Sequence, residues 1–238
     1  MTNPQNPTAL VTGASEGLGL ALATALVERD WRVVIDARTE ANLVRAADAL
    51  GDLATAVPGD VTDPGHRSAL AHVARETGRV DLLVNNASTI GTSPMPALAD
   101  LDETTVERIY AVNVFAPLAL TRLLLPDLAT SRGVVLNISS DAAVEPYPGW
   151  GGYGPSKAAL DHMTAILATE QRSVTAYALD PGDMRTRMHQ DAEPGEDLSG
   201  LPAPATVVPA VLRLLELRPP SGRFRAGDLT ETLPAGAR

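Results

Sequence analysis

Apolar stretches rich in β-branched residues alternate with amphipathic stretches along most of the chain. Runs typical of buried strands occupy 8–12, 31–36, 53–57, 80–85, 133–139 and 173–179. Helical periodicity fills most of the intervals, at 18–30, 39–50, 64–77, 102–128, 153–170 and 204–217. Because strands that alternate with helices form βαβ units, the pattern predicts a parallel sheet with helices on both faces.

No linker long enough to separate two domains interrupts this pattern, and 238 residues suffice for one large α/β domain. We therefore expect a single domain over 1–238. The segment 183–204 differs from its surroundings, because it is acidic and rich in glycine and proline. It lies between a predicted strand and a predicted helix. Such a segment is either a disordered connection or a lid over a site, and a compact domain favours the lid.

Composition and charge exclude several classes of function. The chain contains no cysteine, which excludes disulfides and thiolate chemistry, and its four histidines form no close cluster, so we predict no metal site. A net charge of −10 gives no electrostatic reason to bind nucleic acid or an anionic membrane. The N-terminal sequence MTNPQNPTALVTG lacks a signal-peptide pattern, and no apolar run approaches a membrane span, which predicts a cytoplasmic protein.

The first predicted strand runs into the glycine-rich sequence TGASEGLG at residues 12–19, where the first helix begins. In an open parallel sheet, ligands bind beyond the carboxyl ends of the strands. Gly13, Gly17 and Gly19 permit a tight turn, a close approach of backbone to a pyrophosphate and close helix–strand packing. Placed between the first strand and helix of a βαβ unit, this turn predicts dinucleotide binding.

The second predicted strand ends in Asp36-Ala37-Arg38, and its residues bear on the choice of cofactor. An acid at this place accepts hydrogen bonds from an adenosine ribose and favours NAD, whereas an arginine pairs with a 2′-phosphate and favours NADP. Equally, Asp36 could cap the next helix and Arg38 could simply be exposed. The residues themselves leave these alternatives open.

Further polar residues follow the next strands. Asp60-Val61 follows the third strand and fits a turn as well as a contact with adenine, and the asparagines of NNA at 85–87 could cap a helix. Within the apolar helical run, Pro117 follows Asn113 by four positions and denies the Asn113 carbonyl its helical partner. That carbonyl must therefore find water or another donor.

The sequence YGPSK places Tyr153 four residues before Lys157 at the start of a predicted helix, so the two side chains share one face. The pair could be an ordinary surface contact, or a phenol made acidic enough to transfer protons. Ser139-Ser140 ends the fifth predicted strand, and Pro181-Gly182 ends the sixth, with Thr186 just beyond.

Taken in order, TGASEGLG, NNAS and YGPSK resemble the cofactor turn, the NNAG sequence and the Tyr-x-x-x-Lys motif of the classical short-chain dehydrogenase/reductase family. The resemblance covers nearly the whole chain and implies a single-domain, doubly wound Rossmann fold with a mostly parallel sheet of about seven strands. It implies a catalytic tetrad of Asn113, Ser140, Tyr153 and Lys157. It also implies cofactor contacts from Gly13, Ser15, Glu16, Gly17, Leu18, Gly19, Arg38, Asp60, Val61, Asn86, Ala87, Tyr153, Lys157, Pro181, Gly182 and Thr186.

The resemblance implies an NAD(P)-dependent oxidoreductase, namely an NADPH-dependent carbonyl reductase that interconverts a ketone and a secondary alcohol. Tyr153 would donate the proton, Lys157 would lower the phenol pKa and hold the nicotinamide ribose, and Ser140 would bind the carbonyl oxygen. Asn113 would anchor a water that joins Lys157 to solvent. The alternative is a non-catalytic NADP-binding sensor on the same fold. NADP(H) is favoured over NAD(H), because the family's acidic NAD-selecting position falls on Ala37 and its NADP-selecting arginine on Arg38.

Three features depart from the family pattern. Glu16 stands where NADP-preferring members often have a basic residue, and Ser88 replaces the final glycine of NNAG. The C-terminal sequence at 221–238 lacks the usual late Gly-Gly, which puts the family's tetramer interface in doubt, although a homo-oligomer (dimer or tetramer) is expected. A small-molecule carbonyl or alcohol is the expected substrate. Its pocket is predicted at residues that could equally be core packing: Val144, Tyr147, Trp150, Met184 and Met188.

Overall fold

The computed structural model describes residues 6–230. The sequence predictions that concern residues 1–5 and 231–238 therefore lie outside the described residues. Within this range the strands form one parallel sheet of seven, in the order β3-β2-β1-β4-β5-β6-β7. The predicted doubly wound Rossmann fold is thereby confirmed. The strands are β1 (Thr8–Val11), β2 (Arg32–Ala37), β3 (Ala54–Pro58), β4 (Val80–Asn85), β5 (Val134–Ile138), β6 (Thr175–Asp180) and β7 (Gly222–Arg225).

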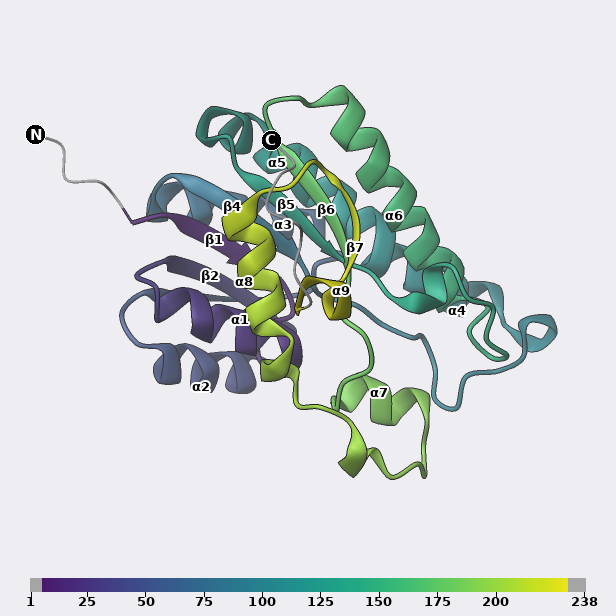
Figure 1. The fold of residues 1–238 in the computed structure, drawn as a ribbon. Coiled ribbons are helices and arrows are strands. Elements are labelled where there is room, and N and C mark those ends of the chain that lie inside the picture. The colour runs from purple at the N-terminus through teal and green to yellow at the C-terminus, as the bar shows by residue number, and fades with distance from the viewer. Residues whose placement is uncertain (1–5, 231–238) are drawn as a thin grey trace, which may run out of the picture.

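Helices cover both faces of the sheet (Figure 1). α1, α2 and α8 pack on one face, and α3, α5 and α6 pack on the other. The helices of the described residues are α1 (Gly17–Val27), α2 (Glu40–Leu50), α3 (Pro64–Thr77), α4 (Glu103–Tyr110), α5 (Ala116–Ser131), α6 (Tyr153–Glu170), α7 (Arg187–Ala192), α8 (Val208–Leu217) and α9 (Ala226–Thr230).

The core divides into two layers, one on each side of the sheet. In β1, Ala9 and Val11 belong to the layer under α1 and α8, whereas Leu10 belongs to the layer under α3 and α5. Successive side chains of a strand point to opposite faces, and both faces are covered. This is why the strands read as continuous apolar runs in the sequence.

The strand order reverses between β1 and β4, which are neighbours in the sheet although two strands separate them in the chain. In doubly wound folds the carboxyl ends of the strands at such a reversal border the ligand crevice. The glycine-rich turn after β1 and Asn86 after β4 therefore lie together at this edge.

Two elements differ from the sequence expectation. The helix predicted at 102–128 is divided into α4 and α5 by a π-helical turn, Ala111–Phe115, in which the Ala116 amide bonds the Ala111 carbonyl. Pro117 supplies no amide hydrogen, so the wider turn accommodates its position. The seventh strand, β7, has no clear counterpart in the hydrophobic pattern, because two of its four residues are arginines.

The expectation that no apolar run approaches a membrane span needs correction. By length and composition alone, the helical segments Glu103–Ser131 and Leu198–Leu217 are long and apolar enough to cross a membrane. In this fold α5 packs on β4 and α3, while α8 packs on α1 and α9. Their apolar character therefore has an explanation in the packing of an α/β core.

Candidate active site

Two adjoining cavities lie beyond the carboxyl ends of the strands. The larger, of about 860 Å³, runs beside the glycine-rich turn, and the smaller, of about 400 Å³, lies beside Ser140. Tyr153 and Ser139 belong to the walls of both. A ligand in one cavity can therefore meet a ligand in the other at the Tyr153 phenol.

The glycine-rich turn owes its shape to residues without a side chain. Gly13 and Gly17 have φ values of +65° and +61°, which lie in the left-handed region that favours glycine. A Cβ on Gly19 would lie 2.5 Å from the Gly13 carbonyl oxygen and 2.6 Å from Asn86 Nδ2. Asn86 Nδ2 donates to the carbonyls of Thr12 and Gly13 at 2.8 and 3.0 Å. Asn86 thus fixes the turn from β4 and does not cap a helix.

Asp36 lines the larger cavity and does not cap α2, so its contact with a ribose stays a prediction. Its buried carboxylate accepts a hydrogen bond from the Gly13 amide at 2.7 Å and lies 3.1 Å from His66 Nε2. Burial raises the pKa of Asp36, and the bonds from His66 and Gly13 oppose this shift. α2 begins after Thr39 without a side-chain cap. Arg38 lines the same cavity but is exposed.

Asp60 combines the two roles that the sequence left open. Its carboxylate accepts hydrogen bonds from the Thr62 amide and hydroxyl, both at 2.8 Å, and it also lines the larger cavity. Burial acts to raise its pKa, but the Thr62 bonds and the charges of Arg38 and Arg108 outweigh burial and lower it. Asp60 is therefore an ionised turn residue at the wall of the cavity.

Most of the residues expected at the cofactor line the larger cavity. Gly182 lines the smaller cavity instead, and Gly19 lines neither, because it packs against the turn. Those in the larger cavity are Gly13, Ser15, Glu16, Gly17, Leu18, Arg38, Asp60, Val61, Asn86, Ala87, Tyr153, Lys157, Pro181 and Thr186.

Tyr153 and Lys157 lie side by side at the start of α6, and both are buried. Lys157 Nζ donates to the Ile138 carbonyl at 2.7 Å and lies 5.4 Å from the centroid of the Tyr153 ring. Trp150 packs edge-on against the same ring with centroids 5.4 Å apart. The phenol is thus held between an ammonium group and an indole.

Burial shifts the pKa values of the pair in opposite directions. It raises the pKa of Tyr153 to about 12, with hydrogen bonds to Ser140 and Ser88 acting against it. It lowers the pKa of Lys157 to about 8, with the charge of Asp161 acting against it. The lowered phenol pKa expected from the sequence is not found, because burial of the phenol outweighs the hydrogen bonds that favour the phenolate. Near neutral pH, Tyr153 is a protonated phenol and can donate a proton.

Ser140 is held by groups that the sequence reading did not identify. Its hydroxyl donates to Asp141 Oδ1 at 3.0 Å, and the Tyr147 hydroxyl donates to Asp141 Oδ2 at 2.8 Å. From β7, Arg223 Nη2 donates to the Ser140 carbonyl at 2.9 Å, and Arg223 Nε donates to Asp161 at 2.8 Å. Arg223 therefore joins β7 to the segment after β5 and to the middle of α6.

Asn113 is fully buried and lines neither cavity. Its Oδ1 accepts from the Ser88 hydroxyl at 3.1 Å and from the Thr89 amide at 2.9 Å. Its Nδ2 donates to the Thr89 carbonyl at 2.9 Å and to Ser156 Oγ at 3.0 Å. The side chain thus joins the segment after β4 to α6, and its role toward a water stays a prediction.

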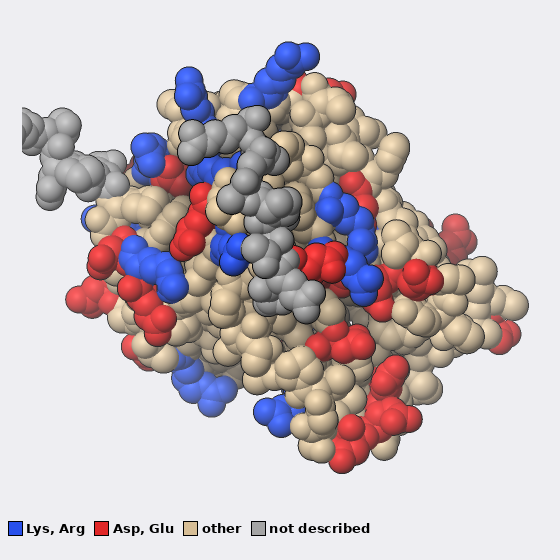
Figure 2. Space-filling view, in the orientation of Figure 1, with Lys and Arg blue, Asp and Glu red and all other residues tan. Residues whose placement is uncertain are grey.

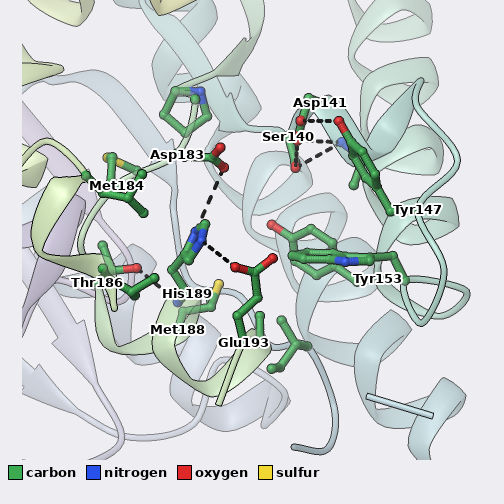
Figure 3. A pocket seen from close by; sticks show the side chains of 18 of the residues that line it. Ser140, Asp141, Tyr147, Tyr153, Asp183, Met184, Thr186, Met188, His189 and Glu193 are labelled. Carbon is green, nitrogen blue, oxygen red and sulfur yellow. Dashed lines mark hydrogen bonds and ion pairs between the residues drawn. The ribbon is translucent and has the colours of Figure 1, made fainter. Parts of the chain in front are cut away.

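The smaller cavity lies between two walls (Figure 3). Ser140, Tyr147 and Tyr153 belong to one wall. The other wall comes from α7 and its flanks, where His189 lies between Asp183 and Glu193 at 3.9 and 3.5 Å. Of the residues expected to contact substrate, Val144 is 62% exposed and lines neither cavity. The others line the smaller cavity: Tyr147, Trp150, Met184 and Met188.

Among residues 6–230, no group of three or more His, Asp or Glu side chains could hold a metal ion. The doubly wound fold, with a glycine-rich turn beside the larger cavity, is typical of dinucleotide-binding proteins. A family model described as short chain dehydrogenase matches residues 7–197. The chain belongs to the short-chain dehydrogenase/reductase family, whose members are oxidoreductases of carbonyl and hydroxyl groups.

Named relatives differ in their substrates. The chain is 36% identical to benzil reductase ((S)-benzoin forming) of Saccharomyces cerevisiae over 194 residues, covering 76% of this chain and 73% of the relative. It is 35% identical to serine 3-dehydrogenase of Agrobacterium fabrum over 183 residues, covering 75% of this chain and 72% of the relative.

Solved structures agree with the fold and include cofactor complexes. A short-chain dehydrogenase/reductase from Saccharomyces cerevisiae has a TM-score of 0.87 at 28% identity, covering 96% of this chain and 100% of the other. A Shigella flexneri short-chain dehydrogenase complexed with NADP has a TM-score of 0.86 at 27% identity, covering 94% and 98%. A 3-ketoacyl-(acyl-carrier-protein) reductase from Brucella melitensis complexed with NADH has a TM-score of 0.84 at 27% identity, covering 94% and 97%. These comparisons support a nicotinamide cofactor.

The burial of Lys157 can be measured directly, because it is the only lysine in the sequence. In protein labelled with ¹³C-lysine, we expect the single side-chain Cε signal to titrate near pH 8, well below the ordinary value of 10.5. Burial in an apolar site disfavours the ammonium form, which is the reason for the shift. Titration of the folded protein near pH 10.5 would show that the ammonium is solvated.

The same burial makes stability depend on pH. Between pH 8 and 10.5 the unfolded chain binds more protons at Lys157 than the folded protein does, so the Lys157 contribution to the free energy of unfolding rises with pH. We expect wild type to gain stability relative to Lys157→Met by an amount approaching about 1.4 kcal/mol per pH unit between pH 8 and 10. Denaturant melts at several pH values measure this difference, and a pH-independent difference would contradict it.

Proposed function

We propose that this protein is an NADPH-dependent carbonyl reductase that interconverts a ketone and a secondary alcohol. One observation carries the proposal: Tyr153, a protonated phenol, lines both cavities. It lies beside Lys157 and interacts with Ser140 through a hydrogen bond. A proton donor shared by a dinucleotide cavity and a second cavity is what carbonyl reduction requires. The relatives named as a reductase of benzil and a dehydrogenase of serine support this reaction class.

The larger cavity fits a nicotinamide dinucleotide. Its glycine turn carries no Cβ at Gly13 and Gly17, and α1 begins at Gly17, so backbone amides are available to a pyrophosphate. Asp60 and Asn86 line this cavity, where Asp60 would contact the adenine, and Lys157 and Thr186 would hold the nicotinamide end. When bound, the reduced cofactor supplies a hydride to the carbonyl carbon of the substrate.

Side chains of this protein donate the proton and stabilise the negative charge that develops on the substrate oxygen. Tyr153 holds a proton on its phenol oxygen and gives it to the substrate oxygen. Ser140 donates a hydrogen bond to the same oxygen as negative charge develops there. To do so its hydroxyl must turn from Asp141, to which it donates at 3.0 Å. Lys157 steadies the phenolate that Tyr153 leaves behind, and Asn113 holds α6 in register through Ser156.

The choice of NADP rests on Arg38 and on the position of Asp36. Arg38 is exposed at the larger cavity, where it can pair with a 2′-phosphate. Asp36 lines the same cavity, but its two carboxylate oxygens already contact the Gly13 amide and His66, which favours Arg38 as the residue that selects the cofactor. Glu16 also lines this cavity and acts against the preference.

The proposal also includes the oligomeric state of the protein and its location in the cell. Phe115 and Leu118, on the π-helical turn and α5, are 59% and 42% exposed. Apolar side chains exposed on a long helix support a homo-oligomer, which members of this family commonly form. We propose a cytoplasmic homo-oligomer that acts on a small molecule and has no nucleic-acid or membrane partner, consistent with the net charge of −10.

Tyr153→Phe tests the reaction. The change keeps the ring and its contact with Trp150 but deletes the proton donor, so kcat should fall by at least about 10²–10⁴-fold. NADPH binding should survive, since Lys157 and the glycine turn remain. Tyr110→Phe is the matched control, because Tyr110 contacts Phe115 and lines neither cavity. Retention of wild-type turnover in Tyr153→Phe would refute the assignment, and NADPH binding by wild type without turnover of any ketone would favour the sensor.

Arg38→Ala tests the cofactor. Loss of a charged partner to the 2′-phosphate should weaken NADPH binding by roughly 10- to 100-fold, equivalent to about 1.5–3 kcal/mol, and leave NADH binding unchanged. Arg45→Ala removes an exposed arginine of α2 that lines neither cavity and serves as the control. Fluorescence titration of both cofactors gives the affinities. Equal losses for NADPH and NADH, or a wild-type preference for NADH, would count against Arg38.

Hydrogen exchange tests the proposed lid at 183–204. The segment contains α7 and supplies one wall of the smaller cavity, so ordering by cofactor and substrate should protect its amides. We expect protection of this segment to increase when NADPH is added, while the buried strand β5 stays unchanged. Strong protection that is the same with and without NADPH would identify a rigid wall.

A further inference from the structure

Acidic side chains outnumber basic ones in the lining of the smaller cavity. Within the described part of the chain, no lysine or arginine lines it, and His189 is its one basic side chain. Asp180 is neutralised from behind by Arg223 and Arg225, at 3.5 and 3.6 Å. The acidic residues of the lining are Asp141, Asp180, Asp183, Glu193, Glu196 and Asp197.

The charges on the wall around α7 do not cancel. Asp183 and Glu193 share the single imidazole of His189, so even a protonated His189 leaves one negative charge in this group. Hydrogen bonds from Ser199 lower the pKa of Asp197, which stays ionised at neutral pH. Figure 2 shows Asp and Glu side chains gathered over α7 and the segment that follows it. The wall that Asp183, Glu193 and Asp197 contribute to the cavity therefore carries net negative charge.

The Asp141 carboxylate lies beside Ser140, at the end of the cavity where the carbonyl would be reduced. Asp141 Oδ1 is 3.0 Å from Ser140 Oγ, the group that would bind the substrate oxygen. Asp141 accepts hydrogen bonds from the hydroxyl groups of Ser140 and Tyr147 and from the Ala142 amide, and no salt bridge joins it to a cation of residues 6–230. A positive group on a carbon close to the carbonyl would therefore lie within reach of this carboxylate.

Two further observations point to a ligand with polar and cationic character. Ser139 lines both cavities and is 2% exposed, and its buried hydroxyl has no hydrogen-bond partner within the described residues. Tyr147 and Trp150 present aromatic rings to the same cavity, and aromatic faces attract cations. The acidic side chains thus surround a cavity that already contains the reacting groups and a ring system suited to a cation.

We propose that the substrate of this site is a cation: a ketone, or the corresponding alcohol, that carries a protonated or quaternary amine near the carbonyl carbon. This inference rests on the proposed carbonyl reduction. Asp141 contacts the cation near the reacting carbon, and Asp183 and Glu193 attract it from the wall of the cavity. Keto acids and phosphate-bearing thioesters are disfavoured, because their negative charges would face carboxylates without a compensating cation.

A pair of isosteric ketones isolates the effect of charge. (2-Oxopropyl)trimethylammonium and 4,4-dimethylpentan-2-one differ only in a nitrogen cation against a carbon. With NADPH, we expect wild type to have a higher kcat/KM for the cation, and 4-oxopentanoate to be the poorest substrate. The preference should shrink between about 10 mM and about 1 M salt, over which the screening length falls from about 30 Å to about 3 Å.

The variant Asp183→Asn/Glu193→Gln tests the two carboxylates. Comparing the kcat/KM ratio of the two ketones between variant and wild type removes the difference in their intrinsic reactivity. Both changes are nearly isosteric, so the ratio of kcat/KM values, cation over neutral, should fall by roughly 10-fold relative to wild type. Asp48→Asn is the control, because it removes one exposed charge on α2 far from the cavity and should leave the ratio unchanged. An unchanged ratio in the double variant, or a preference of wild type for the neutral ketone, would overturn the proposal.

A binding measurement separates this inference from the proposed reaction. Calorimetry with (2-hydroxypropyl)trimethylammonium and its neutral isostere 4,4-dimethylpentan-2-ol, on protein saturated with NADP⁺, needs no turnover. Tighter binding of the cation that is lost in the double variant supports a cation site even if no ketone is reduced. Equal binding of the two alcohols refutes the cation site, even if ketones are reduced.

Discussion

The site depends on the burial of the first turn of α6 against the carboxyl edge of the sheet. Gly154 allows this approach, since a Cβ there would lie 2.6 Å from the Ala142 carbonyl oxygen. The Lys157 ammonium is brought to the Ile138 carbonyl, and Ser156 is brought to Asn113. The same packing removes Tyr153 and Lys157 from water and shifts their pKa values in opposite directions. A protonated phenol beside a lysine of lowered pKa is a consequence of this close contact.

Charged groups elsewhere hold the edge of the sheet in place. The Asp36 carboxylate lies under the glycine turn and joins the Gly13 amide to His66 on α3. Arg223 joins the last strand to Ser140, Asp161 and Asp180. Because a buried charge is costly unless it is paired, each of these groups constrains the positions of its partners. The cofactor side of the site is therefore held by the contacts of Asp36, and the substrate side by those of Arg223.

The two cavities differ in charge although they share a wall. Arg38, Arg185 and Arg187 line the larger cavity, where a dinucleotide would bring phosphates, whereas the smaller cavity has no arginine or lysine within the described residues. α7 supplies both surfaces, with Arg187 toward one cavity and Glu193 just beyond its end toward the other. One short helix thus separates a site for an anionic ligand from an acidic site.

The sequence by itself determined the alternation of strands and helices, the glycine turn and the spacing of Tyr153 and Lys157, because these depend on local periodicity and short-range geometry. It could not place β7, because two arginines break the apolar pattern expected of a strand. Arg223 is accommodated there by its contacts with Asp161 and Asp180, which only the fold brings close. Nor could it show that Asp36 faces Gly13 and His66, or that Asp141 holds Ser140, since the pattern does not record which way a polar side chain turns. The pKa values and the charge of each cavity depend on burial and on distances between residues remote in the chain. Only the tertiary structure decides those.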